Sequence, residues 1–311
     1  MRLAADLVLR NGRIVTLDAA DRTVQALAAR DGRIVATGSD ADIEGITGPG
    51  TEVIDLAGRT AIPGIVDSHC HPDSYAARLA RWHDVGPANV AGRAALLDRI
   101  AAACRALPPD GWFAGYRFND HKSGGFPTRA ELDAAGGGRP VFLLRTDGHL
   151  GVANTAGFRA CGIADDAPDP AFGRFDRHPV TGAFTGLLRE TATHVFLSVI
   201  HGGDTPEDIA GGLRKVFADW HRYGITTVYN SLAGARAIRA YQLLKDSGAL
   251  TMRVGIIVSG REEGLVESYV AAGIRSGFGD DWLRVIGVEW CPDCSTSGRT
   301  AAYYDPYVGT P

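Results

Sequence analysis

The feature that most limits the possible folds of this chain is a regular alternation of helical and apolar strand patterns after residue 200. Three apolar runs, 225–229, 252–258 and 283–289, each follow a segment whose apolar residues recur at helical spacing. Strands and helices that alternate in this way build a parallel sheet whose faces are covered by helices. The sequence therefore predicts an α/β fold, with a barrel and a doubly wound sheet as the two alternatives.

The first 60 residues follow a different pattern, which is typical of β-structure. Short apolar runs flank the pairs Asn11-Gly12 and Asp31-Gly32, and such pairs favour the tight turns of β-hairpins. We therefore expect a small β-sandwich segment over residues 1–60.

The long stretch before residue 200 mixes several local patterns. Thr128, followed three residues later by Glu131, is a capping box and predicts the start of a helix. A capping residue followed by proline predicts another helix from Thr205. Residues 165–185 are rich in Asp, Pro and Gly, so we expect an irregular loop there.

An apolar run, 62–66, leads into two histidines that are one residue apart. Side chains alternate along a strand, so His69 and His71 would point to the same side. Two imidazoles on one face at the end of a strand can bind one metal ion, and Asp67 would make a supporting hydrogen bond there. Because short motifs also match by accident, a solvated or hydrogen-bonded pair of histidines is the alternative.

Charge and cysteine content argue against several functional classes. The formal net charge is −4, which gives no reason to expect a nucleic-acid or membrane partner. Asp6 interrupts the N-terminus before a signal-peptide core could form. The five cysteines are irregularly spaced, which fits reduced thiols rather than a disulfide framework. We therefore expect a cytoplasmic protein.

Several motifs, taken together and in this order, resemble the metal-dependent amidohydrolase superfamily. They are a β-rich start, Pro-Gly-x-x-Asp-x-His-x-His over residues 63–71, and the helix–strand units that follow. Within the superfamily, the chain is similar to the group related to N-substituted formamide deformylase, amidohydrolase family 3. This closer resemblance rests on residues 126–133, on 144–149 with Asn154, and on Asp293-x-Ser295 followed by 299–301.

The resemblance implies a (β/α)8 TIM barrel joined to the N-terminal β-sandwich segment, with the active site at the carboxyl ends of the barrel strands. Residues 61–311 would be only about the first half of that barrel, with an insertion at about 72–200. The first four barrel strands would be 65–69, 225–229, 252–258 and 283–289.

The resemblance also implies a metal site. In such enzymes one or two divalent ions, zinc in particular, activate a water molecule that attacks an amide-type carbonyl. By motif match, His69 and His71 would bind metal. Relatives carry a carboxylated lysine at the end of the fourth strand, where this chain has Glu289. Glu289 would be a further metal ligand, with a structural ion pair as the alternative.

The function implied is hydrolysis of carbon–nitrogen bonds other than peptide bonds, in small amide- or formamide-type substrates. The resemblance places His149, Asn154 and Asp293 near the substrate. Relatives take their aspartate general base from a later strand, so this aspartate is expected beyond Pro311. We therefore expect the chain to be an incomplete and inactive fragment, and a homo-oligomer is compatible with the sequence.

Two other functional classes remain open. One is a non-catalytic binding protein that keeps the amidohydrolase fold. The other is a thiol redox protein, because residues 290–294 resemble the Trp-Cys-x-x-Cys of thioredoxin-like proteins, with Cys291 and Cys294 as the pair. A redox domain, however, needs more sheet after this motif. Solvated or packing roles are expected for five further histidines, His121, His178, His194, His201 and His221.

Overall fold

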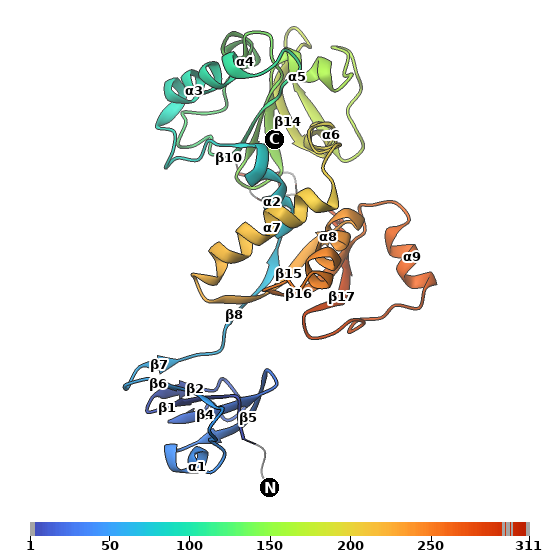
Figure 1. Ribbon diagram of the computed structural model, residues 1–311. Helices are drawn as coiled ribbons and strands as arrows, with labels where there is room; N and C mark the ends of the chain where they lie inside the picture. Colours follow the sequence, from blue (N-terminus) through green and yellow to red (C-terminus); the bar gives the residue numbers. More distant parts are fainter. Residues whose placement is uncertain (1–3, 294–295, 297–298, 300, 309–311) are drawn as a thin grey trace. The chain divides into compact units, whose positions relative to one another are not determined.

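Figure 1 shows the computed structural model of the chain, which describes residues 4–293, 296, 299 and 301–308. Two compact units are present. The first comprises Met1–Val66 with Gly224–Thr226, and the second comprises Asp67–Tyr223 with Thr227–Pro311. All residues predicted to belong to the functional site therefore lie in the second unit.

The first unit contains two small β-sheets, with strand orders β5-β4-β1-β6 and β3-β2-β7 (Figure 1). Its elements are β1 Leu7–Arg10, β2 Arg13–Val15, β3 Thr23–Val24, β4 Ala26–Arg30, β5 Arg33–Gly38, α1 Asp40–Glu44, β6 Glu52–Asp55 and β7 Thr60–Ala61. Asp31 and Gly32 have φ values of 49° and 72°, as a two-residue turn between β4 and β5 requires. The hairpin predicted at Asp31-Gly32 is confirmed.

The hairpin predicted at Asn11-Gly12 is wrong. β1 pairs with β4 and β6, whereas β2 pairs with β3 and β7, so this turn joins strands of different sheets. The side-chain amide of Asn11 donates to Asp55 at 2.8 Å. A Cβ atom on Gly12 would collide with the Leu56 side chain. Packing against residues more than 40 positions away along the chain thus decides which strands pair here.

A four-stranded sheet with the order β17-β16-β15-β8 carries the regular part of the α/β fold (Figure 1). β15, β16 and β17 pair in parallel, and the predicted α/β class is confirmed. Its elements are β8 Ile65–Cys70, α2 Pro72–Arg81, α7 Pro206–His221, β15 Ile225–Ala233, α8 Ala235–Asp246, β16 Arg253–Ser259, α9 Leu265–Ala271 and β17 Leu283–Glu289. No helix in the described part of the chain has both the length and the apolar character needed to cross a bilayer.

The outer strands of this sheet, β8 and β17, each have one edge without a neighbouring strand among the described residues. Apolar side chains are exposed on both strands, by 51% for Val66 and 45% for Val288. Unpaired edges with exposed apolar side chains favour association with further strands. The sheet is therefore open within the described residues.

A second, six-stranded sheet is formed by the segment between α2 and α7, in the order β13-β14-β12-β11-β10-β9. Its elements are β9 His83–Asp84, α3 Gly92–Ala106, β10 Phe113–Phe118, α4 Arg129–Gly136, β11 Val141–Arg145, β12 Leu150–Ala153, α5 Thr155–Ala160, β13 Gly173–Arg177, β14 Phe184–Glu190 and α6 Thr191–Ile200. Alternate residues of β11 serve two cores: Phe142 packs with Phe196, whereas Val141 packs with Leu132. Burial on both faces explains why β11 reads as a continuous apolar run.

Both predicted helix starts are confirmed. The Thr128 hydroxyl accepts a hydrogen bond from the Glu131 amide at the start of α4, and the Thr205 hydroxyl accepts one from Asp208 at the start of α7. In both capping boxes the acidic side chain also accepts from the cap amide. These local patterns therefore act as the sequence indicated.

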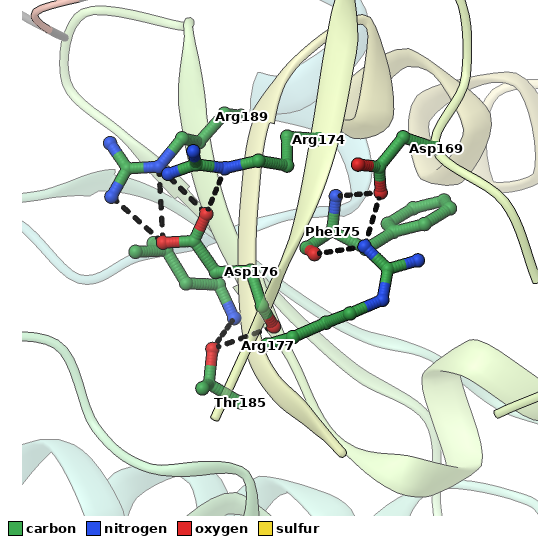
Figure 2. A network of polar contacts seen from close by, with 8 residues as sticks. Asp169, Arg174, Phe175, Asp176, Arg177, Thr185 and Arg189 are labelled. Atoms are coloured by element: carbon green, nitrogen blue, oxygen red, sulfur yellow. Dashed lines mark hydrogen bonds and ion pairs between the residues drawn. The ribbon is translucent and has the colours of Figure 1, made fainter. Parts of the chain in front are cut away.

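The irregular loop predicted for residues 165–185 is partly wrong, because this segment contains β13 and the start of β14. β13 is an edge strand and pairs antiparallel with β14. Figure 2 shows the ion pair that joins the two strands: Arg189 of β14 reaches both oxygens of Asp176 of β13, with Nη2 at 2.8 Å from Oδ2. Within β13, Arg174 Nε adds a contact to Asp176 at 2.8 Å. Polar pairing of this kind leaves no apolar periodicity, so the sequence pattern did not reveal the strand.

Candidate functional site

The predicted histidine pair lies where β8 ends. His69 is in the strand, and His71 directly precedes α2, whose first residue is Pro72. The two imidazole rings are 5.4 Å apart between centroids and stand at 86° to each other. Both residues are exposed. The alternation of the strand thus brings the two rings together.

Neighbouring groups orient this pair. His71 Nδ1 lies 2.9 Å from the carbonyl oxygen of Ser231 in β15. A carbonyl only accepts, so Nδ1 carries the proton and Nε2 keeps the lone pair that a metal ion could bind. The Asp67 carboxylate accepts a hydrogen bond from the His69 amide at 3.2 Å.

Glu289 is the last residue of β17 and lies close to the same strand ends. Its carboxylate accepts a hydrogen bond from the hydroxyl of Ser231. Ser231 is itself buried. One residue of β15 thus holds His71 through its carbonyl and Glu289 through its hydroxyl.

The histidine pair and Glu289 line a cavity of about 410 Å³ in the second unit, which is within the size range of small-molecule sites. The wall combines the ends of parallel strands with the turn between β11 and β12 and with α6. Its residues are His69, His71, Ser74, Arg78, Thr146, Asp147, Gly148, His149, His194, Leu197, Leu232, Ser259, Arg261, Glu289 and Cys291.

His149 reaches the cavity from the turn between β11 and β12. Its Nδ1 lies 2.7 Å from Oε2 of Glu190. This hydrogen bond raises the pKa of His149 above its ordinary value, against the opposing effect of burial. The negative charge of Asp147 acts in the same direction as Glu190, and the positive charge of Arg261 acts against it. His149 therefore holds its proton more firmly than an isolated histidine.

His194 lines the same cavity from α6 and behaves in the opposite way. Burial lowers the pKa of His194 to about 4, and the charges of Arg261 and His149 add to this effect. The cavity thus contains one histidine that favours the charged form and one that favours the neutral form. Opposed shifts of this kind are typical of sites that perform acid–base chemistry.

A buried carboxyl lies behind the histidine pair. Burial raises the pKa of Asp73, and the nearby His71 and Asn230 oppose this effect. Among the described residues, Asp73 Oδ1 and Arg78 Nε are buried without a hydrogen-bond partner. These groups also line a second cavity of about 370 Å³, which shares Arg78 and His194 with the first.

The structure gives Asn154 a structural role, and its predicted contact with substrate stays a prediction. Asn154 is fully buried as the N-cap of α5. Its Oδ1 accepts from the amides of Val141 and Gly157 at 2.9 and 2.8 Å, and its Nδ2 donates to the Arg139 carbonyl at 2.9 Å. A weaker contact to Leu132 uses the second amide proton, so every polar atom of the side chain serves the backbone.

The C-terminal residues contribute less to the described cavity. Asp293 accepts a hydrogen bond from the Ala302 amide at 3.2 Å and is not among the described residues that line the cavity, so its substrate role stays a prediction. Cys291 lines the cavity as a free thiol. Three residues of the motifs noted above, Cys294, Ser295 and Thr300, lie outside the described residues.

The residues present fit part of a metal site. His69 and His71 offer two imidazoles, and the bond from His71 to a backbone carbonyl is the support that metal-binding histidines usually have. Zinc sites in proteins use three or four protein ligands. In the described part of the chain, no group of three or more His, Cys, Asp or Glu side chains is arranged to hold a metal ion. The described chain thus offers two ligand positions, His69 and His71. Glu289 lines the same cavity, and its carboxylate is hydrogen-bonded to the Ser231 hydroxyl.

Three groups beside the cavity carry no distinguishing sequence signal. They are Glu190, His194 and Arg261. Glu190 and His149 are 41 residues apart in sequence, and only the pairing of β12 with β14 brings them together. The one usable signal would have been the strand ends, because Glu190 is the last residue of β14 and Arg261 follows β16. His194 lies within α6 and has no such signal.

Comparison with known proteins gives consistent matches. Residues 52–311 match the Amidohydrolase family. The N-substituted formamide deformylase of Arthrobacter pascens is 30% identical over 250 residues, which are 79% of this chain and 46% of that protein. The exoenzymes regulatory protein AepA of Pectobacterium carotovorum subsp. carotovorum is 28% identical over 231 residues, 72% of this chain and 49% of that protein.

A solved structure is similar over nearly the whole chain. The crystal structure of an uncharacterized metal-dependent hydrolase from Pyrococcus horikoshii OT3 superposes with a TM-score of 0.71 at 25% identity. The superposition covers 97% of this chain and 57% of that protein. The chain thus spans about half the length of the relatives it matches.

Proposed function

Since this chain belongs to the amidohydrolase family, we propose that it serves the metal-dependent hydrolysis of carbon–nitrogen bonds other than peptide bonds. The observation that carries the proposal is the histidine pair, in which the Ser231 carbonyl holds His71 with the His69 ring 5.4 Å away. The similarity to an N-substituted formamide deformylase supports a small amide- or formamide-type substrate. The similarity to a metal-dependent hydrolase supports a divalent ion, and we propose zinc.

In this proposal His69 and His71 hold the metal ion. Glu289, whose carboxylate accepts from the Ser231 hydroxyl beside them, would be a further ligand of one or two ions. A bound divalent ion supplies the Lewis acidity that activates water and polarises a carbonyl.

Residues of the chain itself bind and orient the substrate. The turn that carries His149 is held in place, because Asp147 accepts from the His149 amide at 3.1 Å. Arg145 braces Asp147 at 2.6 Å and also binds Asp120 at 2.8 Å. This rigid turn presents the His149 side chain to the cavity, where it donates a hydrogen bond to the substrate.

We further propose that the four-stranded sheet is the first half of a (β/α)8 barrel over residues 61–311, with 1–60 as a β-sandwich segment. The TM-score of 0.71 to a hydrolase that is matched over 57% of its length supports this arrangement. The remaining strands would supply the other metal ligands and the general base. On this basis we expect the 311-residue chain alone to bind metal but not to turn over substrate.

A non-catalytic binding role is the second candidate. It is favoured by the similarity to a protein named as a regulator. The lack of a group of three potential metal ligands among the described residues is also consistent with it. Such a protein would keep the fold without using the histidine pair.

Metal binding distinguishes the two candidates. The chain is loaded with zinc and dialysed, and its metal content is measured by mass spectrometry for the wild type and for a His69→Ala/His71→Ala variant. The matched control is His121→Ala/His178→Ala, which removes two exposed histidines elsewhere. We expect zinc in the wild type and the control and its loss from the first variant.

Equal zinc content in all three proteins would contradict the proposed metal site. Turnover is tested with formanilide by following the release of aniline. Chelator-sensitive turnover by the 311-residue chain would contradict the expectation that this chain lacks part of the catalytic machinery.

A further inference from the structure

Glu190 and His149 are joined twice. The backbone amide of Glu190 donates to the carbonyl of His149 at 2.8 Å. The side chains are joined as well, with Nδ1 of His149 at 2.7 Å from Oε2 of Glu190. A carboxylate that accepts from Nδ1 leaves Nε2 as the nitrogen that faces other partners. The pairing of β12 with β14 thus sets both the position and the orientation of the imidazole.

The backbone of Glu190 is unusual for a residue with a side chain. Its φ and ψ values are 53° and −123°, at the point where β14 ends and α6 begins. Glycine takes up this conformation easily, whereas a residue with a side chain is strained in it. Glu190 is also buried, with 7% of its surface exposed. The Glu190 carboxylate accepts a hydrogen bond from His149, and a glycine at the same turn would have no side chain to do so.

The charged groups around His149 come from several elements. Glu190 and Asp147 favour its protonated form, whereas Arg261, beyond β16, opposes it. His194 of α6 is close enough to interact with His149, and burial keeps it neutral. The other ionisable side chains that line this cavity are His69, His71, Arg78, Glu289 and Cys291.

We propose that Glu190 is a positioning residue that holds His149 as the proton donor to the departing nitrogen of the substrate. This inference rests on the proposed function, because it assigns a step in the same cavity. His149 enters the cavity from the inserted sheet, whereas the histidine pair belongs to the parallel sheet. The carbon–nitrogen bond that breaks would thus lie between two sides of one cavity. The acyl group would face His69 and His71, and the nitrogen would face His149.

Protons and electrons balance over the hydrolysis of the carbon–nitrogen bond. Water adds its oxygen to the acyl carbon. When the carbon–nitrogen bond breaks, its electron pair goes to nitrogen, which takes the Nε2 proton of His149. The attacking water releases one proton to solvent as it adds, and after the transfer the neutral imidazole takes one proton from solvent, which restores the imidazolium. Each turnover then consumes one water, releases a carboxylic acid and an amine, and leaves the protein unchanged.

The test follows the imidazole of His149 directly. The metal-free chain is labelled with ¹⁵N-histidine, and long-range ¹H–¹⁵N spectra are recorded between about pH 5 and pH 9, around the ordinary histidine pKa. His149→Gln assigns the signal by its loss. We expect the Nδ1-to-carboxylate bond to raise the titration midpoint of the wild type, and Glu190→Gln to move this midpoint to lower pH.

Two further variants separate the loss of the Glu190 carboxylate from a general loss of folding. Glu190→Gly removes the carboxylate but suits the positive φ, so it should fold and should also lower the His149 midpoint. Asp176→Asn removes a paired carboxylate from β13 of the same sheet (Figure 2) and should leave the midpoint unchanged. Aniline, the amine product of formanilide, should shift the Nε2 signal of the wild type and shift it less in Glu190→Gln.

The outcomes separate this inference from the proposed function. An unchanged His149 midpoint in Glu190→Gln and Glu190→Gly would overturn the positioning role, and so would an equal shift in Asp176→Asn. No response of the Nε2 signal to aniline would overturn the donor role. Zinc measured on the same proteins is independent: Glu190→Gln should retain it, and its absence from the wild type would count against the metal site alone.

Discussion

Replacing Asn154 by alanine tests whether this residue is structural. The change removes three hydrogen bonds of 2.8–2.9 Å that the side chain makes with the backbone of Val141, Gly157 and Arg139. Asn154 is fully buried, so water does not replace the lost partners. At about 1 kcal/mol or more for each bond, Asn154→Ala should lower the free energy of unfolding of this region by roughly 3 kcal/mol. This corresponds to roughly a 150-fold increase in local opening.

Hydrogen exchange measures the loss where it occurs. The amides of Val141 and Gly157 both donate to Asn154, so peptides that contain them should exchange faster in the variant. Urea denaturation followed by circular dichroism gives the change in the free energy of unfolding. Asn89→Ala, at an exposed position, is the matched control and should change it by less than about 0.5 kcal/mol. A loss below about 1 kcal/mol for Asn154→Ala, or unchanged exchange at both amides, would refute the structural role and reopen a role in substrate contact.

Three further predictions concern individual side chains. His194 has its pKa lowered to about 4 by burial, so the unfolded chain binds a proton that the folded chain excludes; stability should fall as pH decreases from about 6.5 to about 4, and urea midpoints of His194→Gln should show a flatter pH dependence. Thr128→Ala should cost about 1 kcal/mol by removing the N-cap of α4, seen as a lower melting temperature that Thr128→Ser largely restores. Asp176→Asn should cost about 1–2 kcal/mol by breaking the two-nitrogen contact with Arg189; a loss that does not diminish in high salt would contradict an ionic contribution.

The turn signals show how far local patterns can be used. Asn11-Gly12 and Asp31-Gly32 carry the same signal, yet only the second closes a hairpin. Both asparagine and aspartate adopt the positive φ that such a turn needs. What differs is the partner of each flanking strand, and this depends on residues far along the chain. A local sequence pattern therefore predicts where the chain turns but not which strands pair on either side of the turn.

Asn154 shows the same limit for the site. The sequence places it after a strand and beside His149, which is compatible with both a substrate contact and a helix cap. Burial and four backbone partners favour the cap. Conversely, no potential ligand or catalytic residue stands near His194 at a spacing that would indicate a site, but α6 brings His194 into the cavity.

The sequence by itself determined the α/β class, most of the strands and helices and the closeness of His69 to His71. These features depend on periodicity and on neighbours along the chain, and such information is local. Only the tertiary structure decided that Ser231, 160 residues from His71, orients its ring, and that Glu190, 41 residues from His149, holds the other imidazole. These contacts arise because strand pairing and core packing bring distant backbone segments together, and no spacing within the sequence encodes that distance.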